Sequence, residues 1–544
     1  MRRFERTFGV SVLCLLCFSL GCGGTETLTV GGTISGLNGT LILQLNGGND
    51  LTLTENGPYV FDITLEKAST YAVTIQARPS NQNCSVINAT GTVVDTDIAN
   101  ADVICADKAW THPTNTADAI NPEGSAAFNV QVAMSDNGDA VVVWPQNNGT
   151  HLQIFVSEYR NGVWTHPRDL NDNISPDGFD ARRVHVAMGD DGQTIVAWSQ
   201  MTAASWQIFF SQYLNGAWTH PSGIDDFISP ATGGDATWPK VAMDGMGNAL
   251  IVWQQGIAGN SRILVSQYRE GRWIHPSSTS QHVDPRDGYS RNPFPVMNDL
   301  GEALVVWQQD VGTHFQIFKS EFRDELWLYP LSSTDDISPD GSNTHGPRAA
   351  IDNEGNAIVV WEQSDGERVQ VFKSEYRNGG WIHPVDLTDN ISLDGEHCGY
   401  PQVAMSDAGT ALIVWEQEHE GQEQAFVSEY REGAWTHPAS FDDHISPNGA
   451  YQYLDEARVA MDAHGNAIVA WFQEIGPDPA PYQVFMSEYR RESWTHPERL
   501  QDYISFFGTD GTYPEVAMDN NGDAIVVWYD EVGGETQIFV SEYR

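Results

Sequence analysis

A short segment recurs along most of the chain and limits what the chain can fold into. It reads VSEYRNGVWTHP at 156–167 and returns, lightly changed, at 265–276, 373–384 and 427–438. A second marker, an apolar run that ends in tryptophan, recurs about every 55 residues. Its eight copies end at Trp144, Trp198, Trp253, Trp307, Trp361, Trp415, Trp471 and Trp528. This repeat predicts a series of similar units over residues 106–544, each packed on its neighbours.

Each unit has the pattern of four short antiparallel strands. In the copy at 401–438 the strands are PQVAMS, TALIVWEQ, EQAFVSEYR and AWTHP, and the two tight turns between them, DAG and EG, carry glycine. Such turns between β-branched and aromatic runs are hairpin signals. The longest link, of roughly twenty residues, follows the fourth strand, so we expect it to run from the outer edge of one sheet to the centre of the next. Four-stranded sheets repeated radially form a β-propeller.

The two ends of the repeat region are half copies. The segment AWTHP at 109–113 holds only the last strand, and VSEYR at 540–544 belongs to a third strand. An open sheet edge invites association with other chains, so we expect AWTHP to supply the outer strand of the last sheet and close the ring. The predicted fold is all-β, with an eight-bladed β-propeller over 106–544 that is closed by its N-terminal strand. Seven blades or an open solenoid are the alternatives.

The first 22 residues have the pattern of an export signal. Basic residues precede an apolar run of roughly a dozen, which is too short to span a bilayer in the mature protein. The run ends in Ser19-Leu20-Gly21-Cys22, which resembles the lipobox of bacterial lipoproteins, although leucine is usual where Ser19 stands. The resemblance implies a signal peptide at 1–21, a lipid on Cys22 and a short tether at 22–24. Because Gly23 follows the cysteine where aspartate would retain the protein at the inner membrane, it also implies export to the outer membrane or cell surface of a Gram-negative bacterium. Plain secretion is the alternative.

Residues 25–105 differ from the repeats in composition and in sequence pattern. Runs such as LTVGGTISGL, GTLILQL and TYAVTIQA alternate with Gly and Asn turns, which predicts a small β-sandwich. In an oxidising compartment we expect a disulfide between Cys84 and Cys105, whereas Cys398 is interpreted as an incidental buried thiol. The stretch resembles the immunoglobulin- or transthyretin-like modules of bacterial surface lipoproteins. That resemblance implies a stalk domain that has no catalytic role.

The formal net charge of −45 narrows the range of partners. A field of this sign keeps a protein in solution and repels nucleic acid and anionic lipid, so we expect no nucleic-acid partner and a monomer. Membrane contact is expected through the lipid on Cys22. Alternatively, the acidic residues only keep the protein in solution and have no bearing on its partners.

Residues that are repeated in every unit are interpreted as structural. Side chains at the same place in every blade of a ring point to different places, so the histidines of the WTHP segments are not expected to meet at one metal ion. The turn MSDNGDA at 134–140 and its copies resemble the Asp-box of sialidase-like (BNR) propellers, but lack its leading Ser or Thr and its tryptophan. This resemblance implies the fold and not the activity. No cofactor is expected, with calcium as the one candidate, because loops such as SDGE at 364–367 and EHEGQE at 418–423 are acidic.

Function is expected where the repeats disagree, near the axis of the ring. One position per blade, thirteen residues before each repeated tryptophan, reads Gln131, His185, Lys240, Phe294, Arg348, Gln402, Arg458 and Glu515. Four potential cations there are unexpected in a chain with 28 Lys and Arg, so we predict an axial site for an anionic or sugar-like ligand. With neighbouring positions, its candidate residues are Arg183, His185, Trp238, Lys240, Arg348, Tyr400, Arg458 and Tyr513. Alternatively, these cations pair with acidic linkers such as Asp177, Asp340 and Asp394 and merely hold the blades together.

Two function classes remain. A non-catalytic surface lipoprotein would present the propeller face to a glycan or protein, with Lys240, Arg348 and Arg458 as charge partners and aromatic residues as stacking surfaces. A glycan-active hydrolase or lyase of the sialidase-like type would need acid–base residues such as a carboxylate pair. No pair stands out among 73 acidic residues, and the sequence has no P-loop, Rossmann, nucleophile-elbow or HExxH motif. The sequence therefore favours binding over catalysis and names no catalytic residue.

Overall fold

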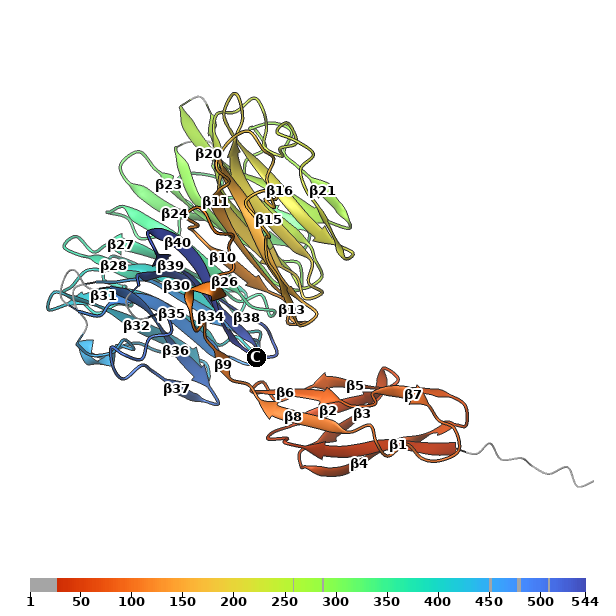
Figure 1. Ribbon diagram of the computed structural model, residues 1–544. Coiled ribbons are helices and arrows are strands. Elements are labelled where there is room, and N and C mark those ends of the chain that lie inside the picture. Colours follow the sequence, from red (N-terminus) through yellow and green to blue (C-terminus); the bar gives the residue numbers. More distant parts are fainter. Residues whose placement is uncertain (1–26, 258, 286–287, 450–452, 477–480, 507–508) are drawn as a thin grey trace, which may run out of the picture. The chain divides into compact units, whose positions relative to one another are not determined.

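The computed structural model describes residues 27–544 except 258, 286–287, 450–452, 477–480 and 507–508. The chain forms two compact units, the first ending at Asp107 and the second running from Lys108 to Arg544. Both are built of β-strands, which form ten four-stranded sheets (Figure 1). Two short 3-10 turns, η1 (Thr116–Asp118) and η2 (Phe441–Asp443), lie in the links. Within the described ranges, no helix has the length and apolar character needed to cross a membrane.

The predicted signal peptide and the predicted lipidation site, Cys22, lie outside the described residues.

The first unit consists of two sheets around one hydrophobic core. Its strands are β1 (Thr27–Ser35), β2 (Leu41–Leu45), β3 (Gly48–Leu53), β4 (Gly57–Glu66), β5 (Thr70–Ala77), β6 (Gln82–Val86), β7 (Thr90–Thr92) and β8 (Val103–Asp107). One sheet has the order β4-β1-β8-β6 and the other the order β3-β2-β5-β7. Val30 and Phe61 from the first sheet and Leu43 from the second are buried in the same core. Burial of both inner faces is what the alternating apolar pattern of these strands requires.

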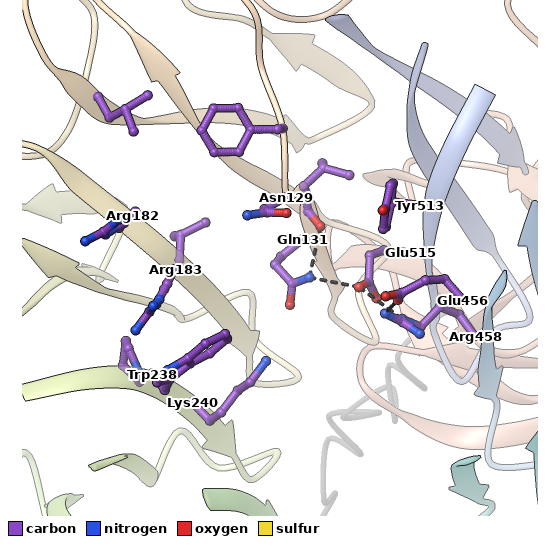
Figure 2. Close-up of a pocket in the computed structure, with 15 residues that line it drawn as sticks. Asn129, Gln131, Arg182, Arg183, Trp238, Lys240, Glu456, Arg458, Tyr513 and Glu515 are labelled. Carbon is purple, nitrogen blue, oxygen red and sulfur yellow. Dashed lines mark hydrogen bonds and ion pairs between the residues drawn. The ribbon is translucent and has the colours of Figure 1, made fainter. Parts of the chain in front are cut away.

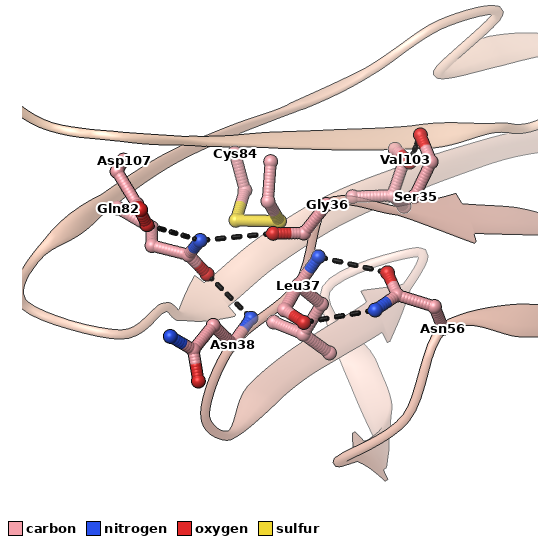
Figure 3. The surroundings of a disulfide bond; sticks show 10 residues. Ser35, Gly36, Leu37, Asn38, Asn56, Gln82, Cys84, Val103 and Asp107 are labelled. Atoms are coloured by element: carbon pink, nitrogen blue, oxygen red, sulfur yellow. Dashed lines mark hydrogen bonds between the residues drawn. A yellow bond between two sulfur atoms is a disulfide. The ribbon is translucent and has the colours of Figure 1, made fainter.

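A disulfide joins Cys84 of β6 to Cys105 of β8, which face each other across neighbouring strands (Figure 3). Beside it, the side-chain amide of Gln82 donates to the carbonyl oxygen of Gly36 and to the carboxylate of Asp107. Because β6 is the edge strand of its sheet, these contacts fix the edge to an inner strand.

The second unit consists of eight four-stranded sheets. Their first strands are β10 (Gln131–Met134), β14 (Ala181–Met188), β18 (Ala236–Met243), β22 (Ser290–Met297), β26 (Thr344–Ile351), β30 (Cys398–Met405), β34 (Leu454–Met461) and β38 (Gly511–Met518). The second strands are β11 (Ala140–Asn147), β15 (Thr194–Met201), β19 (Ala249–Ile257), β23 (Ala303–Asp310), β27 (Ala357–Ser364), β31 (Ala411–His419), β35 (Ala467–Glu474) and β39 (Ala524–Val532). The third strands are β12 (Leu152–Arg160), β16 (Trp206–Leu214), β20 (Asn260–Arg269), β24 (Phe315–Arg323), β28 (Val369–Arg377), β32 (Gln422–Arg431), β36 (Tyr482–Arg490) and β40 (Glu535–Tyr543). The short fourth strands are β13 (Val163–Thr165), β17 (Ala217–Thr219), β21 (Arg272–Ile274), β25 (Leu326–Leu328), β29 (Gly380–Ile382), β33 (Ala434–Thr436), β37 (Ser493–Thr495) and β9 (Trp110–Thr111).

The first strands of these sheets follow one another around a closed ring. Each contacts the first strand of the next sheet, from β10 and β14 to β34 and β38, and β38 contacts β10 in turn. In the last sheet β9 is the outer strand beside β40, where Trp110 pairs with Tyr543. This is the position predicted for the AWTHP segment. Four-stranded sheets arranged radially in this way form a β-propeller.

The repeated tryptophans form the core between the sheets. All eight are fully buried on the second strands. In seven sheets the indole donates to a glutamine two residues later, as Trp361 does to Gln363 at 3.0 Å. Gln363 in turn donates to the carbonyl oxygen of Pro339 in the link that precedes its sheet. In this sheet the tryptophan and glutamine therefore tie the link to the second strand.

In seven of the eight sheets, a repeated arginine joins the third strand to the next sheet. Arg377 lies 3.8 Å from the centre of the Tyr430 ring and donates to the carbonyl oxygen of Gly409. Its Nε also forms an ion pair with Glu375. Arg544 makes the equivalent ring and carbonyl contacts with the first sheet. We call the seven residues with these contacts the latch arginines: Arg160, Arg269, Arg323, Arg377, Arg431, Arg490 and Arg544.

The histidines of the WTHP segments support the outer strands. The ring of His383 stacks on Trp381 with centroids 5.7 Å apart, and its Nδ1 bonds to the hydroxyl of Ser374 at 3.0 Å. Burial lowers the pKa of His383 to about 4, so it stays neutral at physiological pH. The other members of the set are His112, His166, His220, His275, His437 and His496, and Tyr329 takes the place in the remaining sheet. Across the described residues, no three His, Cys, Asp or Glu side chains gather in a way that could hold a metal ion.

Candidate functional site

Every sheet of the ring begins with the same backbone distortion. In seven sheets the first strand carries one extra residue relative to the second strand, as between His345 and Arg348, which is a β-bulge. One residue per sheet has a left-handed backbone at this point, with φ between 49° and 60°. We call these the bulge residues: Asn129, Arg183, Trp238, Asn292, Gly346, Tyr400, Glu456 and Tyr513. A bulge changes the direction in which the side chain of its extra residue points. Here the bulges bring eight residues, one from each sheet, to the centre of the ring.

Two cavities, which we call the mouth, lie among the bulge residues. The first has a volume of 540 Å³ and the second 430 Å³. Figure 2 shows the first cavity, with Arg183 and Lys240 on one side and Arg458 and Tyr513 on the other. All eight bulge residues line one cavity or both. The site therefore takes at least one residue from every sheet.

Seven of the eight predicted site residues line the mouth: Arg183, Trp238, Lys240, Arg348, Tyr400, Arg458 and Tyr513. The exception is His185. Its Nδ1 accepts the backbone N–H of Val241 at 3.2 Å, which ties the second sheet to the third. Burial, followed by the charges of Lys240 and Arg348, lowers the pKa of His185 well below its usual value. His185 is therefore a neutral supporting residue beneath the mouth.

Arg458 is the paired cation of the mouth. Its Nε lies 3.1 Å from Glu515, and its guanidinium also pairs with Glu456. Glu515 accepts a further hydrogen bond from Gln131 at 2.9 Å, so these groups join the first, seventh and eighth sheets. These are the ion pairs of the mouth among the described residues.

Four other cations line the mouth without such partners. One of them, Arg182, lies over the ring of Trp206 at 3.8 Å. Arg348 donates to the side chain of Gln402 at 3.3 Å and to a neighbouring carbonyl, and Arg183 lies over the ring of Trp238 at 4.0 Å. Lys240 makes no hydrogen bond or ion pair with any residue that the structure describes. Lys240, Arg183 and Arg348 thus have no carboxylate at ion-pair distance within that part of the chain.

The local field reflects this excess of positive charge. Burial, and then the charge of Arg348, lower the pKa of Lys240 to about 7, an effect that Glu515 opposes and Arg458 reinforces. Burial, and then Arg458, lower the pKa of Arg348 to about 10. An anion that entered the mouth would raise the pKa of both groups again, because an opposite charge favours the protonated form.

The predicted stacking residues differ in how freely they can act. Tyr400 is 54% exposed and is the most open of them. Trp238 is 44% exposed, but the Arg183 guanidinium covers one face of its ring. Tyr513, at 41% exposed, is itself stacked on Tyr529, with ring centroids 5.2 Å apart. Tyr400 therefore offers a ligand the best aromatic surface.

The acidic linkers do not neutralise the mouth. Asp177 and Asp394 accept hydrogen bonds from nearby asparagine side chains, and Asp340 lies 4.0 Å from His314. The carboxylates that do line the mouth are Glu362, Glu456 and Glu515. Sequence reasoning missed Glu362 and Glu456 as site residues. Glu456 stands at the same repeat position as Arg183 and Trp238, and that equivalence was the available signal.

Three glutamate carboxyl groups lie near Tyr400, and one of them, Glu362, lines the second cavity. Glu362 accepts the backbone N–H of Tyr400 at 2.7 Å. Burial, and then Asp455, raise the pKa of Glu416 well above its usual value. Burial raises the pKa of Glu423 to about 7. Glu423 can therefore hold a proton near neutral pH.

The opposite end of the first strands is acidic. The turns that follow these strands place Asp136, Asp190, Asp299 and Asp407 at equivalent positions. Burial, and then Asp136 and Asp299, raise the pKa of Asp190 to about 6, because these carboxylates lie near one another. An anion is therefore attracted at the bulge end of the ring and repelled at the turn end.

The remaining thiol has no place in this chemistry. Cys398 is buried, and burial raises its pKa to about 12, so it is not a thiolate at neutral pH.

No family model and no curated protein matches this sequence. Solved structures resemble it at low identity. A protein of unknown function from Dyadobacter fermentans is 12% identical with a TM-score of 0.35, and the match covers 78% of this chain and 97% of that one. An ulvan lyase of family PL25, bound to a saccharide of GlcA and Rha3S, is 9% identical with a TM-score of 0.40, covering 77% and 94%. Trypanosoma rangeli sialidase is 9% identical with a TM-score of 0.34, covering 80% and 57%. Likenesses of this size concern the fold and leave the activity open.

Proposed function

We propose that residues 106–544 form an eight-bladed β-propeller whose mouth binds an acidic glycan without changing it. A β-sandwich stalk at 25–105 and a lipid on Cys22 would hold this propeller, as a monomer, at the outer membrane or cell surface. The ligand enters at the bulge end of the ring.

The unpaired positive charge of the mouth carries this proposal. In a chain with a net charge of −45, Lys240, Arg183 and Arg348 come together without a carboxylate partner among the described residues. Buried charges are normally paired, because desolvation is costly. The desolvation of these unpaired charges is best explained by a ligand that supplies the missing negative charge.

The shape of the mouth favours a sugar over a simple inorganic anion. Cavities of 540 and 430 Å³ are much larger than a phosphate or sulfate ion requires. The exposed ring of Tyr400 offers an apolar surface beside the polar groups. Acidic sugars combine a carboxylate or sulfate with an apolar ring face, and they match both features.

Titration calorimetry with the full chain tests the proposal. The probes are oligogalacturonate for carboxylate sugars, chondroitin sulfate oligosaccharides for sulfated ones, and maltooligosaccharide as the neutral control. We expect binding of at least one acidic probe, none of the neutral probe, and loss of binding in Lys240→Met. Arg272→Met, which removes an exposed cation on the outer strand β21, is the charge-matched control and should bind normally. Equal binding by Lys240→Met and the wild type would overturn the proposal.

A glycan-active lyase is the second candidate, and the amine of Lys240 favours it. With a pKa of about 7, this amine can accept a proton from the carbon next to a uronate carboxylate, while Arg348 holds that carboxylate. The C–O bond to the leaving sugar would then break, a carbon–carbon double bond would form, and the leaving oxygen would take a proton from water. Ultraviolet absorbance of the unsaturated product measures this turnover. Turnover that Lys240→Met abolishes would favour the lyase, and tight binding without turnover would favour the first proposal.

A further inference from the structure

The mouth consists of two cavities that offer room for more than one sugar unit. Their volumes are 540 and 430 Å³. Each lies within the range of about 300–1,000 Å³ that holds a drug-sized ligand. A single sugar ring is smaller than such a ligand, so it would leave one cavity empty.

A bar of four side chains separates the cavities. The residues that line both are Trp238, Lys240, Glu456 and Arg458, which we call the bar. The first two belong to the third sheet and the last two to the seventh, four steps apart in the ring of eight. They therefore reach toward each other from opposite sides, and Figure 2 shows Lys240 across the first cavity from Glu456 and Arg458.

Each cavity has a cation of its own beyond the bar. Arg183 lines only the first cavity, as does its neighbour Arg182, and Arg348 lines only the second. Lys240 stands between them in the bar. Positive groups without a carboxylate partner among the described residues thus follow one another across the mouth.

We infer that the mouth binds an acidic oligosaccharide of at least two sugar units, laid across the bar with a negative group in each cavity. This inference rests on the proposed function and names its ligand class. Arg183 and Arg348 hold the two ends of the bound segment, and Lys240 holds the part that crosses the bar. An acidic monosaccharide reaches one of the two arginines and leaves the other unpaired.

Ligand length is the variable that tests this inference. The full chain, Arg183→Gln and Arg348→Gln are titrated with galacturonate, trigalacturonate and pentagalacturonate, and with chondroitin sulfate di- and hexasaccharides. In the series that binds, we expect the longer saccharide to bind at least about 30-fold more tightly than the shortest, since the second contact is made within one complex. Each substitution should weaken the longer saccharide about tenfold, and only one of the two should weaken the shortest. Arg272→Gln is the matched control on the outer strand and should change neither affinity.

The outcomes separate this inference from the proposed function. Equal affinity for short and long saccharides, with both lost in Lys240→Met, would overturn the two-cavity arrangement and leave the proposed function standing. A normal affinity for long saccharides in either arginine variant would also overturn it. If no acidic saccharide of either series binds, both proposals fail. Melting temperatures of the variants, expected within a few degrees of the wild type, show whether they are folded.

Discussion

Two sets of cations in this propeller have opposite surroundings. A latch arginine contacts an aromatic ring and a carbonyl oxygen of the next sheet, and six of the seven also pair with a glutamate two residues earlier. In the mouth, Lys240, Arg183 and Arg348 have no such carboxylate within the described chain, and burial lowers the pKa of each. The first set is satisfied within the chain, and the second leaves positive charge for a ligand.

Ring geometry explains the difference. A latch arginine occurs in seven of the eight sheets and contacts only the next sheet, so the copies stay far apart and can be identical. Mouth residues meet at the axis, where different side chains can act on one ligand. Repetition therefore marks the scaffold and divergence marks the site, and the following variants test that distinction.

Lys240→Met is expected to have the largest effect, with opposite signs for binding and stability. Binding of an acidic oligosaccharide should weaken about 100-fold, since truncating one partner of a buried charge pair costs about 2–5 kcal/mol. The free protein should melt at a higher temperature, because folding lowers the pKa of Lys240 from 10.5 to about 7. Below pH 10 this lysine must lose its proton or bury its charge on folding, and methionine does neither. Titration and scanning calorimetry measure both effects, and a lower melting temperature with unchanged affinity would contradict the prediction.

Arg377→Leu should lower the stability of the protein and leave its affinity for the ligand unchanged. It removes a latch and copies Leu214, the residue at the equivalent position of the second sheet. Loss of the ring contact and of charged hydrogen bonds should lower the free energy of unfolding by about 1.5–3 kcal/mol. Ligand affinity should stay unchanged, because the latch lies between third strands. Thermal melts and titration calorimetry check both statements, and a loss of binding as large as that of Lys240→Met would end the distinction.

The affinity for an acidic oligosaccharide should fall as the pH rises from 6 to 8, by up to about tenfold. Lys240 has a pKa of about 7 and binds an anion in its protonated form, so the proton is lost across this window. Arg348, with a pKa of about 10, stays charged, and His185, whose pKa is well below 6.5, stays neutral. Arg458 and Glu515 complete the groups that act on Lys240. Titrations across this range should give a slope for the wild type and a flat profile for Lys240→Met; a flat wild-type profile would contradict the assignment.

The smallest expected effect comes from adding the missing latch. The double substitution Gln212→Glu/Leu214→Arg restores the SEYR pattern in the second sheet, where Gly247 and Tyr268 stand in the next sheet at the partner positions. We expect a gain of about 0.5–1 kcal/mol in the free energy of unfolding. Chemical denaturation measures it, with Gln212→Glu alone as the control. A decrease would show that the latch contacts are not transferable between sheets.

The parts of this molecule that could be predicted from sequence are those set by repetition. Equal strands pack in equal register, so counting back from each tryptophan located Lys240 and Arg348 in the same layer. The same argument placed Trp110 beside Tyr543. These predictions needed no knowledge of side-chain contacts.

The bulges and the pairings of the mouth could not be predicted in this way. A left-handed residue is normally signalled by glycine or asparagine, and Asn129, Asn292 and Gly346 carry that signal. Trp238 and Glu456 do not, because the extra residue of the strand imposes their backbone conformation. Pairing across the axis depends on where those side chains then point.

The repeated bulge also bears on how such a protein can diverge. Since strand pairing fixes the unusual backbone, the position accepts residues as different as glycine, tryptophan and glutamate. The side chain at each of the eight bulge positions can therefore be exchanged while the buried tryptophans and the latch arginines keep their contacts. Single substitutions there would change what the mouth recognises and leave the pairing of the strands as it is.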